Sequence, residues 1–140
     1  MFSNSLEMNT ISLSTMGLDA SIKRRAVIAN NIANVDTPYY KRKEVVFESE
    51  LKRAIDSMGK PSIPTKTTDK RHIQFSIPKD FRSVSPKIHV EYDSNYRNDK
   101  NNVDIEKEIS DEVKNSLRYK ALINVINRNF QKLENMMKWK

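Results

Sequence analysis

The sequence predicts a mainly α-helical protein, in which long helices at the two ends of the chain pair as a coiled-coil-like bundle. Apolar residues recur at intervals of three and four in both terminal segments, as in amphipathic helices. The 140-residue chain contains only two glycines, too few for a turn-rich β-protein. Four of its five prolines lie between residues 61 and 102, so the terminal segments are almost free of helix breakers.

The first predicted helix carries a stripe of residues spaced alternately by four and three positions. The stripe consists of Ile11, Thr15, Leu18, Ile22, Arg25, Ala29 and Ile32. Alanines at positions 26, 29 and 33 allow another helix to approach closely. Arg25 lies at the rim, either facing an acidic partner or with its stem buried and its charge in water. The residues expected to take part in pairing and assembly are Ile11, Leu18, Ile22 and Ala29.

Residues 29–41 are dense in Asn, Asp, Thr and Pro, and they predict a sharp end to this helix near Ile32. Asn and Asp tolerate the left-handed backbone region, and the residue before a proline is driven out of the helical region. The tyrosines after Pro38 can pack their rings while each hydroxyl finds a polar partner. From the residues alone this is a helix-exit motif. Its members are Asn31, Ile32, Ala33, Asn34, Asp36, Thr37, Pro38 and Tyr40.

The middle of the chain predicts a short helix and then a small irregular or β excursion. Apolar residues from Phe47 to Met58 fall at helical spacing, and Gly59-Lys60-Pro61 stops the helix. Two later runs alternate with a period of two, at residues 73–77 and 88–92, and predict a two-stranded pair at the surface.

The last predicted helix runs from Asp104, a candidate N-cap, to about Lys138. Acidic residues crowd its first turns, whereas residues 114–140 carry seven basic side chains and one acid. This polarity complements the helix dipole. At about 1.5 Å per residue the helix is roughly 50 Å long. One apolar row contains Ile105, Ile109, Val113, Leu117, Ala121 and Val125, and the other contains Tyr119, Leu122, Ile126, Phe130, Leu133 and Met137.

We therefore divide the chain into three segments. Residues 1–60 hold the first helix, the turn motif and the short helix; residues 61–102 hold the irregular or β insertion; residues 103–140 hold the last helix. The two terminal segments are expected to form one α-helical assembly domain. Its candidate contact residues on the last helix are Ile109, Val113, Leu117, Leu122, Ile126, Phe130 and Leu133.

The net charge of +7 is spread thinly along the chain. The basic runs at residues 23–25 and 41–43 are each three residues long, and a solvated helix face or strand edge accounts for them. Two alternative functions stay open. A basic nucleic-acid-binding module requires the charge to converge on one face. A secreted amphipathic-helix protein acting on membranes requires helix formation that depends on lipid.

No catalytic, cofactor-binding or metal-binding constellation emerges from the sequence, and we expect no enzyme. The chain has no cysteine, and its two histidines, His72 and His89, lack metal-ligand spacing. The carboxylates of Glu44, Glu106 and Glu108 are expected to be ordinary solvated charges. The first residues lack a basic leader followed by an apolar run, so export would need a route other than a cleaved signal peptide.

The turn motif resembles the N-terminal signature of bacterial flagellar rod and hook axial proteins. The matching residues are Asn31-Ile32-Ala33-Asn34, Asp36-Thr37-Pro38, the aromatic Tyr40 and the basic Lys41. Residues 102–106 and 115–122 are similar to the C-terminal part of the proximal rod proteins of that family. The resemblance covers roughly residues 5–60 and 95–138. Tyr39 departs from it, since the family most often has glycine there; a positive φ at this position would strain a tyrosine.

The resemblance implies a structural subunit of the flagellar basal-body rod, whose terminal helices form the inner layer of a hollow shaft. The implied partners are copies of the chain, other rod proteins, the hook-basal body adapter, the inner-membrane ring and the flagellar type III export apparatus. It also implies a location where the rod crosses the periplasm, reached without a cleaved signal peptide. Nucleic acid and small-molecule ligands are not implied.

Overall fold

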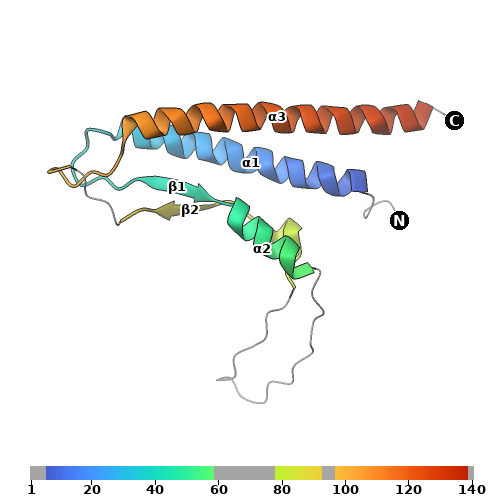
Figure 1. Ribbon diagram of the computed structural model, residues 1–140, viewed down its shortest axis with the longest axis horizontal. Coiled ribbons are helices and arrows are strands. Elements are labelled where there is room, and N and C mark those ends of the chain that lie inside the picture. Colours follow the sequence, from blue (N-terminus) through green and yellow to red (C-terminus); the bar gives the residue numbers. More distant parts are fainter. Residues whose placement is uncertain (1–5, 59–77, 93–96, 139–140) are drawn as a thin grey trace, which may run out of the picture. The chain divides into compact units, whose positions relative to one another are not determined.

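The computed structural model describes residues 6–58, 78–92 and 97–138, and it confirms a mainly helical protein with long, paired terminal helices (Figure 1). The elements are α1 (Leu6–Ala33), β1 (Lys43–Val46), α2 (Glu48–Met58), the 3₁₀ turn η1 (Phe81–Ser83), β2 (Lys87–Val90) and α3 (Ile105–Lys138). They form two compact units: residues 1–46 with 86–140, and residues 47–85. Within the described ranges, no helix combines the length and the apolarity needed to cross a bilayer.

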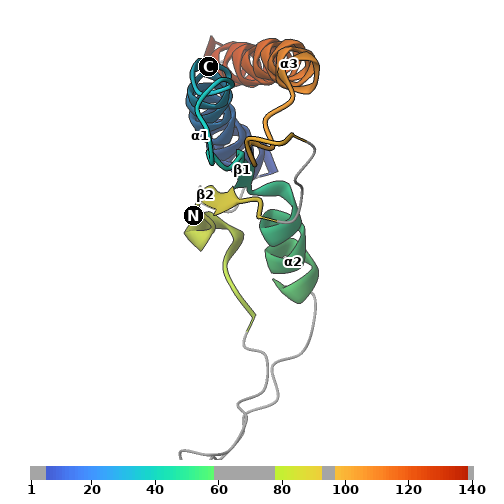
Figure 2. The ribbon, with the colours of Figure 1, turned by 90° about the vertical axis from the view of Figure 1, so that its left-hand side faces the viewer.

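In the first unit, α1 lies between α3 and the two-stranded sheet (Figures 1 and 2). The two helices run in opposite directions, because Asn31 near the end of α1 contacts Glu108 near the start of α3, and Gly17 lies opposite Leu122. The helical segments predicted at both ends of the chain are therefore brought together as an antiparallel pair. The N-cap predicted at Asp104 is confirmed, since its Oδ1 accepts from the Glu106 amide at 2.9 Å.

The contact between α1 and α3 is polar and closely spaced. Ser21 on α1 and Asn115 on α3 are both buried, and Asn115 Nδ2 donates to the Ser21 carbonyl at 2.9 Å. A Cβ on Gly17 would lie 3.0 Å from Leu122 Cδ1, so the helices come close at this glycine. This arrangement fixes the register of the helices through hydrogen bonds as much as through apolar packing.

The predicted stripe on the first helix is displaced from this contact by one residue. The buried positions are Ser14, Ser21 and Ile28, whereas the stripe placed Thr15, Ile22 and Ala29 there, and these three side chains are exposed. The physical reason is that apolar periodicity cannot detect a contact made by small and polar residues. Ser21 Oγ and Asn115 Nδ2 donate hydrogen bonds there, while Asn115 Oδ1 is buried without a hydrogen-bond partner among the described residues. As assembly residues, Ile22 and Ala29 stay a prediction.

The sheet pairs β1 with β2 in antiparallel register, with Lys43 opposite Val90 and Val46 opposite Lys87. The alternation at residues 88–92 correctly indicated a strand, but its expected partner at residues 73–77 lies outside the described residues. The strand partner in the structure, β1, was not predicted as a strand, because a four-residue segment between a turn and a helix gives almost no periodicity signal.

The second unit contains α2 and η1, and the predicted short helix is confirmed as α2. Phe47, Ala54 and Phe81 are buried. The amide of Lys79 donates to Ser57 Oγ at 3.1 Å, which ties the segment before η1 to the end of α2. The glycine stop predicted at Gly59 lies outside the described residues.

Candidate functional site

After α1 the chain turns through backbone hydrogen bonds between residues three positions apart, and these bonds end the helix. The amide of Asn34 donates to the Asn31 carbonyl at 3.1 Å, and the amide of Thr37 donates to the Asn34 carbonyl at 3.1 Å. The chain then leaves the helix direction and enters β1. This agrees with a helix stop at the dense Asn, Asp, Thr and Pro segment.

Asn101 holds this turn from the segment that precedes α3. Its side chain is fully buried, and Nδ2 lies 2.9 Å from each of the carbonyl oxygens of Asn34, Val35 and Thr37. Its Oδ1 accepts from the Val103 amide at 2.8 Å. Only a planar amide presents donors and an acceptor in this way, so Asn101 joins the N-terminal turn to the C-terminal part of the chain.

Asn31 makes the next connection. It is fully buried at the end of α1, where its Oδ1 accepts from the Lys43 amide at 3.1 Å and its Nδ2 donates to the Lys43 carbonyl at 2.8 Å. The same Nδ2 lies 3.0 Å from Glu108 Oε2. One amide side chain thus binds the backbone of β1 and a side chain of α3.

Glu108 and Arg42 form a buried ion pair at the centre of this network. Glu108 has no exposed surface, and its Oε1 lies 2.6 Å from Arg42 Nε. The prediction that Glu108 is a solvated charge is wrong, and Arg42 is also buried despite its place in a short basic run. Sequence could not reveal this pair, because its members are 66 residues apart and each looks like an ordinary surface charge.

Three further carboxylates surround the Arg42 guanidinium: Glu91 at 3.2 Å, and Glu44 and Asp111 at 3.4 Å. Burial by itself lowers the pKa of Arg42, but the hydrogen bond and charge of Glu108, followed by those of Glu91, outweigh it and raise that pKa. The guanidinium therefore stays charged and links the residue before β1 to α3 and to the residue that follows β2.

Tyr40 closes the network on the side of the turn. Its hydroxyl lies 2.7 Å from Asn30 Oδ1 and 3.2 Å from Asn31 Oδ1, and it is the donor because both partners are carbonyl oxygens. Burial, and then the negative charge of Glu108, raise the pKa of Tyr40. The phenol is therefore kept in the neutral form that can donate.

The other turn residues are placed differently. Ile32 and Asn34 are half-buried, and the exposed members of the predicted motif are Ala33, Asp36, Thr37 and Pro38. The motif thus has a buried side, which organises the fold, and an exposed side. Within the part of the chain that the structure describes, no group of three or more His, Asp or Glu residues is arranged to hold a metal ion.

The predicted assembly residues of α3 separate into two sets. Ile109, Val113 and Leu117 face solvent, with exposed fractions of 52, 56 and 62%. Phe130 is also exposed, whereas Leu122, Ile126 and Leu133 are half-buried. On α1, Ile11 and Leu18 are half-buried. The helix pair by itself leaves much of the predicted apolar surface uncovered.

Comparison with known proteins points to one family. A sequence model of the family described as "Flagella basal body rod protein" matches residues 15–41, which include the second half of α1 and the turn. The flagellar basal body rod protein FlgB of Borrelia hermsii is 33% identical over 135 residues, covering 96% of this chain and 99% of the relative. The chain belongs to the FlgB family of flagellar basal body rod proteins.

Other FlgB proteins give the same result. FlgB of Bacillus subtilis is 35% identical over 118 residues, covering 84% of each chain, and that of Aquifex aeolicus is 39% identical over 101 residues, covering 72% of this chain and 70% of the relative. This FlgB-family chain is therefore a structural rod subunit. The relatives give no support to a nucleic-acid-binding or membrane-active function.

Tyr39 of this FlgB-family chain has the positive φ that would strain a tyrosine. Its φ is 62°, and the neighbouring loop residue Lys100 has a φ of 59°. The Tyr39 amide donates to the Asp99 carbonyl at 2.9 Å, and Lys100 Nζ lies 5.7 Å from the centre of the exposed Tyr39 ring. Two left-handed residues from distant parts of the sequence therefore meet at this point.

We expect Tyr39→Gly to be more stable than Tyr39→Ala by about 1 kcal/mol, because alanine keeps the left-handed strain and glycine removes it. Neither variant has the ring, so loss of its contact with Lys100 cancels in the comparison. Urea unfolding followed by circular dichroism measures the difference. Equal stability of the two variants would show that the turn relaxes without strain.

Proposed function

We propose that this chain polymerises through α1 and α3 into the hollow shaft of the flagellar rod, and so transmits torque. The strongest support is that the contact between α1 and α3 leaves a separate row of apolar residues on α3 exposed. Ser21 and Asn115 are buried between α1 and α3, and the two helices come close at Gly17, whereas the side chains of Ile109, Val113 and Leu117 are more exposed than buried. An apolar row left open on a long helix is typical of an interaction surface.

Burial of this surface would stabilise the assembled state. A fully buried Leu, Ile or Val side chain contributes roughly 1.5 to 3 kcal/mol relative to an exposed one, and these side chains already have part of that burial. Because the rod contains many subunits, the total gain in the free energy of assembly is large. A head-to-tail contact that does not close on itself generates a helical filament, which is the form of a rod.

The polar network has a supporting role in this proposal. It fixes the end of α1, strand β1 and the start of α3 against one another through Asn31, Arg42 and Glu108. A neighbouring subunit then meets helices whose relative position is already set, which lowers the ordering cost of association. The terminal segments, residues 1–60 and 103–140, would accordingly act as one assembly domain.

The partners we propose are copies of this chain, other rod proteins, the hook-basal body adapter and the inner-membrane ring. The chain would reach the rod, where it crosses the periplasm, through the flagellar type III export apparatus and without a cleaved signal peptide. It would act without catalysis, cofactor, nucleic acid or small-molecule ligand.

The test is to image basal bodies from a flagellated strain in which this chain is the only protein of its type. Antibodies against the chain should label the rod, and deletion of its gene should give cells that lack complete rods and do not swim. Complementation with the intact gene is the control. Label confined to membranes, or normal swimming after deletion, would overturn the proposal.

A further inference from the structure

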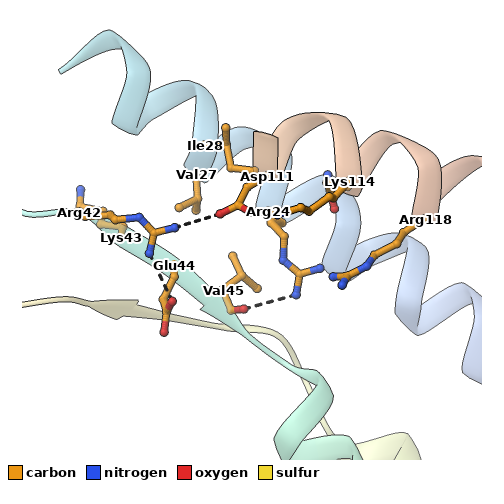
Figure 3. A pocket seen from close by; sticks show the side chains of 11 residues that line it. Arg24, Val27, Ile28, Arg42, Lys43, Glu44, Val45, Asp111, Lys114 and Arg118 are labelled. Atoms are coloured by element: carbon orange, nitrogen blue, oxygen red, sulfur yellow. Dashed lines mark hydrogen bonds and ion pairs between the residues drawn. The ribbon is translucent and has the colours of Figure 1, made fainter. Parts of the chain in front are cut away.

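One edge of the two-stranded sheet, on β1, is occupied by side chains of α1. The amide of Lys43 donates to Asn31 Oδ1, and the carbonyl of Lys43 accepts from Asn31 Nδ2. The carbonyl oxygen of Val45 lies 3.4 Å from Arg24 Nη2, at the pocket between α1, β1 and α3 that Figure 3 shows. In Figures 1 and 2, β2 lies on the side of β1 away from α1.

The other edge of the sheet, on β2, is open. The Glu91 amide donates to the Arg42 carbonyl at 2.9 Å, so Glu91 and every second residue before it direct their backbone groups toward β1. Ile88 and Val90 therefore direct theirs away from β1. Among the residues that the structure describes, no hydrogen bond reaches these outward amide and carbonyl groups. An edge of this kind is a template for another strand.

The side chains along this edge are only partly covered. Ile88 is 50% exposed, and Tyr92, which continues the alternation of Ile88 and Val90, is 70% exposed. Lys87 and His89, which alternate with them, are exposed as well. The edge therefore offers unpaired backbone groups together with apolar side-chain surface.

We infer that β2 pairs with β2 of a second copy of the soluble chain, as a two-fold symmetric antiparallel pair centred on His89. In this register Ile88 of each copy lies opposite Val90 of the other. Because both residues direct their backbone groups outward, each such pair exchanges both of its backbone hydrogen bonds without disturbing the ladder to β1. The sheets of the two copies thus become continuous.

The charges along the strand identify a second copy as the partner and favour this register. It places Lys87 of each copy opposite Glu91 of the other, and opposite charges that face each other across two strands are stabilising. A register centred on Ile88 would instead set Pro86 opposite Val90, and Pro86 has no amide hydrogen to donate. The strand is therefore complementary to itself about His89.

This contact differs from the one that builds a rod. A two-fold symmetric contact uses the same surface on both copies and closes after two, whereas a rod needs a contact that repeats. Since β2 has only 4 residues, the pair is weak and separates readily. It would cover the open edge of the soluble chain and come apart when the chain enters a larger assembly.

A single cysteine tests the pair and its register. The chain has no cysteine, so any disulfide formed by His89→Cys must join two copies. Position 89 would face its counterpart as a non-hydrogen-bonded pair, where Cβ atoms are about 4.5–5.5 Å apart, close to the spacing that a disulfide requires. Lys87→Cys, on the same strand, is the matched control, because its two cysteines would be about 14 Å apart.

We expect oxidised glutathione to link His89→Cys chains about tenfold faster than Lys87→Cys chains, as measured on non-reducing gels of the soluble protein. Two further changes in the His89→Cys chain should slow the linking. Val90→Pro removes an outward amide that the ladder to β1 does not use, and should slow it by about tenfold. Lys87→Glu sets a like charge opposite Glu91, and should slow it by about threefold. Thermal unfolding of each chain, followed by circular dichroism, shows whether the fold is retained.

Equal linking rates for the two single-cysteine chains would overturn the inference, because they would report random collisions. Linking that is unchanged by Val90→Pro or by Lys87→Glu in a folded chain would also overturn it. If Val90→Pro prevents folding, Lys87→Glu alone decides the result. All of these measurements use the soluble chain, so they decide the edge contact independently of the proposed role in the rod.

Discussion

Replacing Arg42 with methionine should lower the free energy of unfolding by about 3–5 kcal/mol, since it leaves Glu108 buried without its ionic partner. Glu108 has no exposed surface, and the remaining hydrogen bond described for its carboxylate, from Asn31, is not charged. The measurement is urea unfolding of the soluble chain near neutral pH, followed by circular dichroism.

The double variant Arg42→Met/Glu108→Leu is the matched comparison. It should recover part of the lost stability, because removing both charges also removes the cost of burying one alone. Arg53→Met, which breaks an exposed pair with Glu50 in the other unit, should change stability by less than about 1 kcal/mol. A similar small effect for Arg42→Met would show that water reaches Glu108 and that the pair does not hold the fold.

Leu117→Asp should abolish rod assembly while leaving the soluble chain folded. The side chain is 62% exposed, so its replacement should change the free energy of unfolding by only about 0.5 kcal/mol. In an assembled contact the same change would bury an unpaired carboxylate, which is costly in an apolar environment. Swimming assays and counts of complete basal bodies measure the effect, with protein levels checked alongside.

Ser116→Asp supplies the control for added charge. Ser116 is exposed and adjacent in sequence, but it lies about 100° around the helix from Leu117. We expect this variant to assemble. Complete flagella in cells that carry Leu117→Asp would mean that the exposed apolar row is not an assembly surface.

The sequence was most informative about features of the fold that depend on residues close together in the chain. Asp104 as a helix cap, the end of α1 before Pro38 and the helical spacing from Phe47 to Met58 depend on neighbouring residues, so they could be read from a single chain. The resemblance carried by the turn motif also identified the family correctly.

Prediction failed where the decisive contacts join distant residues. Ser21 is buried where Asn115 of α3 donates to its carbonyl oxygen, and apolar periodicity cannot detect such a position. The Arg42–Glu108 pair and the pairing of β1 with β2 likewise depend on tertiary packing. Of the turn network, the sequence suggested Asn31 and Tyr40 but missed Asn101, which resembles any polar loop residue until its three carbonyl partners are known.

The Asn101 amide also has a consequence for the order in which the chain folds. It joins residues that are 64 to 67 positions apart, so the N-terminal turn cannot be completed until the segment before α3 is available. Closing so long a loop is slow compared with forming a helix. A chain that emerges N-terminus first therefore carries α1 with an unfinished end until nearly three-quarters of its length has appeared. A chain that ends before Asn101 cannot form these three hydrogen bonds to the turn.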